Sequence, residues 1–397
     1  MAISSAPLPP SDAGGSGRAE TSATSLAELA RLFLRLGVIS FGGPAAHIAL
    51  MEDEIVRRRR WLTREEFLDL LGAANLIPGP NSTELAIHIG RVRAGWAGLF
   101  VAGACFIAPA ALIVLGIAWA YVRFGALPAA AHVMAAVAPV VIAVVIQAIV
   151  GLARTALRSR ELVVLGVAAV VAALVGVHEL VILLVAGGVM AISRARIGAH
   201  DGSKAAAFVL TFAGGESLAG AAGVGAVALT PLFLVFLKIG AVLFGSGYVL
   251  LAFLRADLVV RLGWLTERQL LDAVAVGQVT PGPVFTTATF VGYVLGGVGG
   301  AAVATVGIFL PAFVFVAASG PLLPYVRQSP VARAALDGVN VASLALMAVV
   351  TVQLTRSALT GPVAIAVAVA SAVALLRWRV NVVWLVLGGA LVGLLAR

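Results

Sequence analysis

Long uninterrupted runs of apolar residues dominate this chain after its first two dozen positions. Each half carries four plain runs, at about 96–121, 131–152, 161–176 and 179–193, then at about 299–320, 335–354, 361–376 and 381–396. Runs of this kind are typical of membrane helices, whereas the strands of a membrane barrel would show segments of about ten residues with alternating polarity. The pattern therefore predicts an all-α protein that passes through the membrane many times.

Two further segments at the start of each half are interrupted by glycine and proline. In the first half the breaks are Phe41-Gly42-Gly43-Pro44 and Pro78-Gly79-Pro80. The flanking pieces are short, since residues 26–40 make about 22 Å of helix and residues 81–90 about 15 Å, against a hydrocarbon core of about 30 Å. Arginines flank both breaks, and the positive-inside bias puts these flanks on one membrane face. Each interrupted segment is therefore predicted to be a re-entrant helical hairpin, with one long kinked span as the alternative.

The two halves repeat one another. A shift of 203 residues places Phe41-Gly42 on Phe244-Gly245 and Pro78-Gly79-Pro80 on Pro281-Gly282-Pro283. Beyond one deletion, a shift of 202 places Pro109 on Pro311. Chance similarity between apolar runs does not align proline and glycine at fixed spacing, so the chain is interpreted as a fused duplication. The predicted parts are a disordered cytoplasmic tail at 1–24, repeats at 25–198 and 230–397, and a Gly/Ala-rich connector at 199–229.

Composition supports a lipid environment. Hydrophobic residues make up 61% of the chain and charged residues 11%, with a mean hydropathy of +1.08. A soluble chain carries about 25% charged residues, and so much apolar surface could not be hidden from water. After the tail, roughly 370 residues allow roughly ten to thirteen membrane segments.

The distribution of charge predicts orientation. The excess of 27 Lys and Arg over 18 Asp and Glu is expected to reflect cytoplasmic loops, not nucleic-acid binding. The hairpin flanks of the second half keep few basic residues, namely Arg255, Arg261 and Arg268. This thinning favours an inverted second half, which requires residues 205–229 to cross the membrane once.

Several reaction classes are excluded by residue type. Cys105 is the single cysteine, the five histidines lack metal-ligand spacing, and neither lysine follows a phosphate-binding loop. The sequence therefore predicts no catalytic residue, no metal and no cofactor, and no ATP hydrolysis.

The breaks are the strongest candidates for chemistry. A helix broken at membrane depth exposes backbone N–H groups and a positive half-dipole, which lipid tolerates only where the break lines a cavity or binds a ligand. Paired broken helices in two repeats indicate the substrate site of a transporter, although simple turns at the membrane surface are the alternative. The predicted substrate-binding residues at the breaks are Phe41, Gly42, Gly43, Pro44, Pro78, Gly79, Pro80, Asn81, Ser82, Thr83, Phe244, Gly245, Ser246, Gly247, Thr280, Pro281, Gly282, Pro283, Thr286 and Thr287.

Charged residues near the breaks add a second group of candidates. Arg35 and Lys238 occupy equivalent positions six residues before their Phe-Gly breaks, which suits an anion, with snorkelling to the headgroups as the alternative. Glu84 and His88 are candidates for exchanging a coupling proton in the first half only, with an interfacial polar residue as the alternative for His88. Asp272, like its equivalent Asp69, lies on an amphipathic piece and is expected to be a surface charge or a cap.

These residues resemble the chromate ion transporter family, in its long two-domain form. The resemblance rests on FLRLGVISFGGPAAHIALMEDEIV and WLTREEFLDLLGAANLIPGPNSTELAIHIG, and on their echoes FLKIGAVLFGSGYVLL and WLTERQLLDAVAVGQVTPGPVFTTATFVGY. It implies an inner-membrane permease that expels chromate, with sulfate as an isosteric anion, the proton gradient as the drive, and halves of opposite orientation. One departure is that Gly43-Pro44 becomes Ser246-Gly247, which casts doubt on equal roles for the halves.

The predicted function is secondary export of chromate or a related oxyanion across the cell's inner membrane, in a multi-pass protein that is not an enzyme. Two alternatives stay open: an integral-membrane enzyme acting on phosphorylated lipids, and a passive anion channel. The predicted partners are the oxyanion, protons and the lipid bilayer, without nucleic acid; a homodimer is left open by the sequence.

Overall fold

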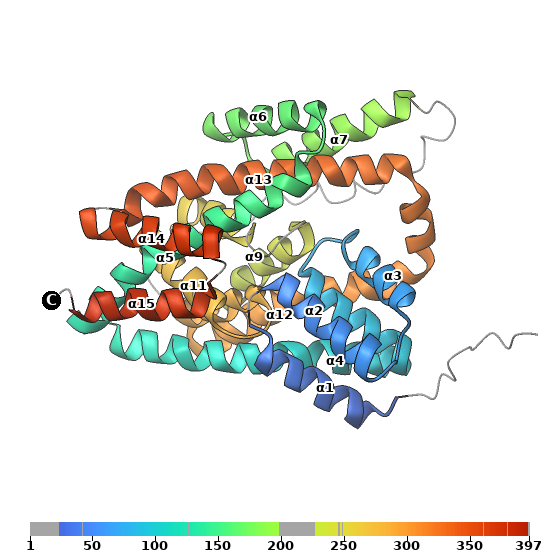
Figure 1. Cartoon of the computed structure of the whole chain (residues 1–397), viewed down its shortest axis with the longest axis horizontal. Helices are drawn as coiled ribbons and strands as arrows, with labels where there is room; N and C mark the ends of the chain where they lie inside the picture. The colour runs from blue at the N-terminus through green and yellow to red at the C-terminus, as the bar shows by residue number, and fades with distance from the viewer. Residues whose placement is uncertain are drawn as a thin grey trace, which may run out of the picture.

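The computed structural model describes residues 24–41, 43–125, 127–197, 227–244, 247, 249–359, 361–378 and 380–395, and the structured elements in these ranges are helices (Figure 1). The tail and nearly all of the connector predicted from the sequence lie outside the described residues. The first half contains α1 (Leu26–Ile39), α2 (Pro44–Glu52), the π-helical η1 (Asp53–Arg58), α3 (Arg64–Ala74), α4 (Asn81–Phe124), α5 (Pro128–Ala156), α6 (Arg160–Leu174) and α7 (Glu179–Ile197). The second contains α9 (Leu229–Val242), α10 (Leu250–Leu254), η2 (Arg255–Arg261), α11 (Glu267–Val279), η3 (Val284–Thr286), α12 (Thr287–Gln328), α13 (Pro330–Ala358), α14 (Pro362–Trp378) and α15 (Val382–Leu395).

The helices end at the predicted breaks. Gly79 has a φ of 137° and Gly282 a φ of 85°, conformations that residues with a side chain rarely adopt. The segments before these breaks begin with matching capping boxes, in which the Thr63 hydroxyl accepts from the Glu66 N–H and the Thr266 hydroxyl accepts from the Gln269 N–H. Helix starts and stops therefore follow local sequence in both halves.

The interrupted segments of the first half are helical hairpins, as predicted. Nη1 of Arg59, just beyond η1, lies 2.6 Å from Oε1 of Glu28 near the start of α1, so the two arms run antiparallel. Nη1 of Arg93 donates to the carbonyl of Trp61 (3.0 Å), and its Nε donates to the hydroxyl of Thr24 (2.9 Å). The three arginine-bearing flanks thus meet on one side of the molecule.

The chain reverses direction within α4. Ala94 and Gly95 leave the helical conformation, and Gly90 lies so close to Gly98 that a side chain there would collide with the Gly98 carbonyl and with Ala102. Residues eight apart in a straight helix would be about 12 Å apart. The element is therefore a short arm, residues 81–93, followed by an antiparallel long arm, residues 96–124. The same reversal occurs in α12 at Gly296 and Gly297.

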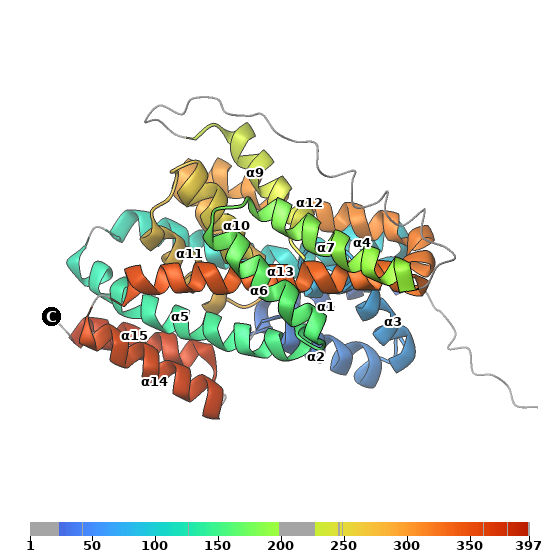
Figure 2. The same cartoon turned by 90° about the horizontal axis from the view of Figure 1, so that it is seen from above.

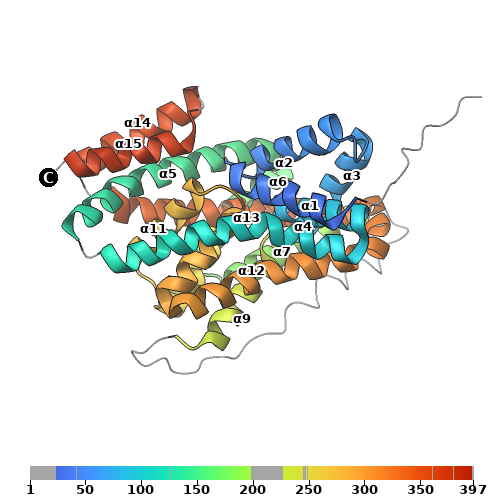
Figure 3. The same cartoon turned by 90° about the horizontal axis from the view of Figure 1, so that it is seen from below.

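The two halves are inverted relative to one another. Gly292 lies against Gly300, which places Phe290 beside the start of the long arm of α12. Phe290 contacts Tyr121, near the end of the long arm of α4, with ring centroids 5.0 Å apart. Equivalent helices therefore run in opposite directions side by side, and Figure 3 shows α4 and α12 alongside one another. This confirms the inverted arrangement.

The last two helices of each half pack on the other half. α6 and α7 lie along α13, while α14 and α15 lie along α5 (Figures 1 and 2). Glycine allows the close approach at equivalent places, since Gly187 faces Val339 and Gly389 faces Val140. The halves are thus interlocked and do not form two separate bundles.

Among the described helices, four segments are long and apolar enough to cross a membrane, namely Asn81–Phe124, His132–Ala156, Val284–Ser319 and Pro330–Arg356. This is fewer than the ten to thirteen segments that the chain length allows. The reason is that much of the apolar sequence forms shorter helices and hairpin arms, which cover only part of a core of about 30 Å.

Candidate functional site at the broken helices

The breaks of the two halves meet in pairs. The N–H of Gly79 donates to the carbonyl of Leu243 (2.8 Å), and the N–H of Gly282 donates to the carbonyl of Ser40 (2.9 Å). Each bond joins the second break of one half to the first break of the other. The structure thus brings together segments that are 164 and 242 residues apart in the sequence. Of the candidate residues, Gly42, Gly245 and Ser246 lie outside the described residues.

Helix N-termini converge where the breaks meet. α2 begins at Pro44, α4 at Asn81, and the η3–α12 segment at Val284, each directly after a break. The first turn of a helix has N–H groups without an intrahelical acceptor and carries about half a positive charge. The prolines and glycines at 78–80 and 281–283 are buried or half-buried, so these ends lie inside the protein.

The polar residues of the second-half break are bonded within their own segments. The hydroxyls of Thr280, Thr286 and Thr287 donate to the carbonyls of Val276 (2.9 Å), Pro283 (2.8 Å) and Val284 (2.8 Å), respectively. A small cavity of about 10 Å³, which is about the room for one water, lies beside this break and is lined by Val145, Gly247, Leu250, Leu251, Val274, Gln278, Val284 and Thr287.

The first-half break contains a histidine that the sequence interpretation missed. His47 is 1% exposed; its Nε2 lies 3.1 Å from the carbonyl of Ser40 and its Nδ1 lies 3.1 Å from the hydroxyl of Ser82. A carbonyl only accepts, so Nε2 carries the proton and donates. His47 therefore ties the first break to α4, and Leu250 at the equivalent position of the second half cannot do so. Its position in the first turn after Gly43 was the available signal.

Three buried polar side chains that follow the second break have atoms without a hydrogen-bond partner in the described part of the chain. The hydroxyl of Thr83, both carboxyl oxygens of Glu84 and Nε2 of His88 form no hydrogen bond with the described residues. Glu84 is 0% exposed, and a side chain at Gly79 would collide with its carboxyl group. Burying a charged carboxylate without a partner is costly, so a proton or a bound ligand is needed there. Asn81 is engaged differently, since its amide donates to Asn75 Oδ1 (2.5 Å).

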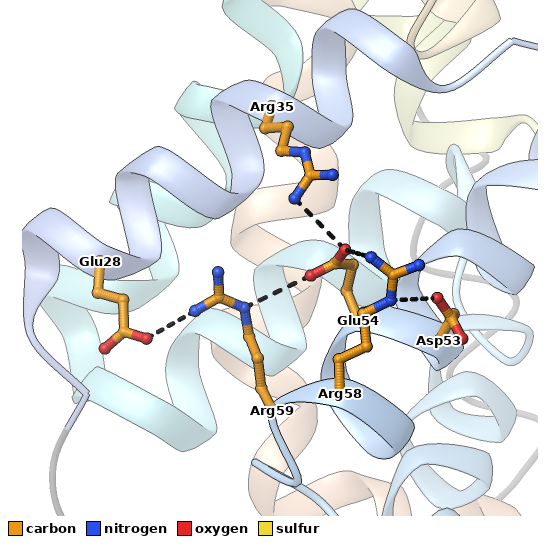
Figure 4. A network of polar contacts seen from close by, with 6 residues as sticks. All are labelled: Glu28, Arg35, Asp53, Glu54, Arg58 and Arg59. Atoms are coloured by element: carbon orange, nitrogen blue, oxygen red, sulfur yellow. Dashed lines mark hydrogen bonds and ion pairs between the residues drawn. The ribbon is translucent and has the colours of Figure 1, made fainter.

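Arg35 and Lys238 are paired with carboxylates on the opposite hairpin arm. Nη1 of Arg35 lies 3.5 Å from Oε1 of Glu54, and Nζ of Lys238 lies 2.7 Å from Oδ2 of Asp257. Figure 4 shows that Glu54 is also approached by Arg58 and Arg59. The positive charges are thus balanced within each hairpin, not left to face the breaks. The carboxylates repeat at the same shift of 203 residues, a signal that the sequence interpretation did not use.

Paired broken helices in two inverted, interlocked repeats define a class of multi-pass transport protein. The family model described as "Chromate transporter" matches residues 27–192 and 230–394. The chain belongs to this chromate transporter family and is a multi-pass protein of the inner membrane.

Two relatives extend the comparison. A "Chromate transport protein" of Cupriavidus metallidurans is 33% identical over 398 residues, covering 98% of each chain. A "Chromate transport protein" of Pseudomonas aeruginosa is 33% identical over 343 residues, covering 84% of this chain and 82% of its own. No solved structure matches this chain.

Proposed function

We propose that this protein is a secondary transporter that exports chromate across the inner membrane and binds the anion where the four breaks meet. The observation that carries the proposal is the convergence of helix N-termini at the cross-half bonds of Gly79 and Gly282. Family membership supports chromate as the substrate. Sulfate is a tetrahedral dianion of similar shape and is expected to compete.

The charge balance of this site differs from the one that the sequence suggests. Arg35 and Lys238 already face Glu54 and Asp257, so they add little net charge. Three helix N-termini at about half a charge each offer roughly one and a half positive charges. Neutral donors must supply the rest, and Ser82, beside His47, is placed to contribute. In this proposal the dianion is therefore held mainly by backbone N–H groups.

The driving force follows from the charge of the substrate. Moving one elementary charge through a membrane potential of 100 mV is worth about 2.3 kcal/mol. A dianion leaving a cell with a negative interior therefore gains roughly 4.6 kcal/mol per 100 mV. We propose that the proton gradient maintains this drive and that Glu84 and His88 exchange a proton during the cycle. Their burial without hydrogen-bond partners among the described residues supports this role.

The test is chromate flux in everted vesicles, in which export appears as uptake. Accumulation against a gradient that collapses on adding a protonophore, together with competition by sulfate, is the expected result. Because the membrane potential alone would accumulate a dianion through a channel, the measurement is repeated with the potential clamped to zero and a pH gradient imposed. Equilibration without accumulation under that condition would indicate a channel. An absence of flux in vesicles that contain folded protein would contradict the proposal.

A further inference from the structure

A polar contact joins the two halves at each end of the long arm of α4. Beside its start, Nη1 of Arg91 on the short arm donates to the carbonyl of Ala317 (2.8 Å), and the Arg91 guanidinium lies 4.2 Å from the ring centroid of Trp96, the first residue of the long arm. Near its end, the hydroxyl of Tyr121 donates to Oδ2 of Asp272 (2.8 Å). A helix rises 1.5 Å per residue, so the two contacts are about 35 Å apart. That separation is close to the thickness of a membrane core.

The meeting point of the breaks lies between these two contacts. Ala110 is about midway along the long arm of α4, and a side chain at Gly282 would come within 2.7 Å of its Cβ atom. Arg91 lies on the side of the molecule where Arg59, Trp61 and Arg93 gather, because it is close to the reversal of α4. The positive-inside bias assigns that arginine-rich side to the cytoplasm, so Tyr121, at the opposite end of the arm, is assigned to the outer face.

Asp272 is not the surface charge that the amphipathic pattern predicted. It is 3% exposed and lies on α11, covered by Tyr121 of the other half. The Tyr121 ring also packs against Phe290, so the side chain is held by both a polar and an aromatic contact. Replacing the hydroxyl alone would thus remove one contact and keep the other.

The equivalent contact cannot form at the inner face. The position equivalent to Tyr121 is Leu323, which has no donor, and the position equivalent to Asp272 is Asp69. Asp69 lines an open surface pocket with Leu62, Glu66, Leu70 and Val92. The tyrosine–carboxylate contact is therefore specific to the outer side, although the scaffold around it is duplicated.

We propose that Tyr121 and Asp272 are positioning residues that form the outer gate, holding α4 of the first half against α11 of the second until the central breaks open outward. The inference rests on the proposed transport at those breaks. A hydrogen bond to a carboxylate shifts an equilibrium by about tenfold or more, which biases the gate toward closure yet allows thermal opening.

The test measures access to Ala288, which is 0% exposed on α12 between the break and Phe290. Ala288→Cys is placed in a Cys105→Ala background and labelled from the outer face with a membrane-impermeant thiol reagent, without any substrate. Tyr121→Phe is expected to raise the labelling rate about tenfold. Asp272→Asn keeps an acceptor oxygen and should raise it less. Asp69→Asn, the matched control at the inner face, should leave it unchanged.

The outcomes separate the gate from the proposed function. Unchanged labelling in both Tyr121→Phe and Asp272→Asn would overturn the gate, and so would an equal increase in Asp69→Asn, which would indicate general loosening. If Tyr121→Phe does not reach the membrane, the labelling rate of Asp272→Asn alone decides whether the gate stands. Increased labelling in a protein whose wild type moves no chromate would leave the gate standing and remove the proposed transport.

Discussion

The two sets of breaks share one backbone plan but differ in their side chains. In the first half, His47 bonds across the break, and Glu84 and His88 are buried without hydrogen-bond partners among the described residues. The equivalent residues of the second half are Leu250, Thr287 and Val291. Both sets still form the same cross-half N–H to carbonyl bond.

This difference shows that the residues that shape the backbone are duplicated, whereas the residues that can exchange a proton are not. The duplicated glycines and prolines build the meeting point of the breaks, whereas titratable side chains occur beside only one of the two sets described. Thr287 satisfies its own hydroxyl with the Val284 carbonyl (2.8 Å) and needs no further partner. We therefore expect substitutions at equivalent positions to have unequal effects, and the predictions below test that asymmetry.

The largest effect is expected at the break glycines. Gly79→Leu and Gly282→Leu should both reduce export to background, because both positions have a positive φ and no room for a side chain. Gly282→Leu should also lower the melting temperature more, since it meets the Cβ atom of Ala110 and the backbone carbonyl of Gly37, while Gly79→Leu meets a carboxyl group that can rotate. The measurements are vesicle flux and thermal unfolding in detergent.

The matched control for the glycines is Gly116→Leu, on the long arm of α4, where an added Cβ meets nothing within 4 Å. It should retain export. Full activity of either break variant would show that these positions are ordinary turns.

The next largest effect is expected at Glu84. Glu84→Gln keeps the shape but cannot exchange a proton, so protonophore-sensitive export should fall at least about tenfold, which corresponds to about 1.4 kcal/mol. Thr287→Val at the equivalent position removes a hydroxyl bonded within its own segment and should cost about fivefold or less, as expected for one neutral hydrogen bond of about 1 kcal/mol. Chromate flux with and without an imposed pH gradient distinguishes them. Equal losses of export in the two variants would contradict the proposal that only the first half exchanges a proton.

A smaller effect is expected from exchanging His47 with its counterpart. His47→Leu removes two hydrogen bonds and should destabilise the fold by about 1–3 kcal/mol, with a severalfold loss of export. Leu250→His buries an imidazole where Phe285 stands in place of Ser82, so one ring nitrogen lacks its hydroxyl partner; the variant should also destabilise, with no gain in export. Thermal unfolding and flux of the two single variants test this. A stable, fully active His47→Leu protein would be inconsistent with a bridging role.

The smallest effects on export are expected at the hairpin cations, and they should be unequal in stability. Lys238→Ala leaves Asp257, which is buried, with Arg261 as its remaining partner at 2.8 Å among the described residues. Arg35→Ala leaves Glu54 with both Arg58 and Arg59. Lys238→Ala should therefore lower the melting temperature more than Arg35→Ala. A larger loss of export in either variant than in Glu84→Gln would indicate that Arg35 and Lys238 contribute to binding the anion.

Much of the local architecture could be predicted because it depends on local rules. Glycine and proline fix where helices stop, threonine caps fix where α3 and α11 begin, and the repeat shows that both halves obey the same plan. Arginine flanks also indicated the hairpins and the inversion, since the positive-inside bias acts on loop composition. The positions of the breaks could be located for the same reason, and the role of their residues in binding stays a prediction.

The sequence could not predict in this way which charged and polar side chains pair with one another. Glu54 and Asp257 had to be placed opposite Arg35 and Lys238 before the charge balance of the hairpins was known. Asp272 had to be covered by Tyr121 before its burial was evident, because an amphipathic helix shows which face is polar but not what lies against it.

The sequence by itself determined the helical membrane class, the duplication, the breaks and the hairpins, because each follows from hydropathy, backbone chemistry or charge within a short window. Only the tertiary structure decided that α6 and α7 pack on α13, that Gly79 bonds to Leu243, and that His47 joins two breaks. The physical reason is that apolar helices of similar composition offer many equivalent surfaces. Shape complementarity and the pairing of buried polar groups select among these surfaces only once the whole chain is folded.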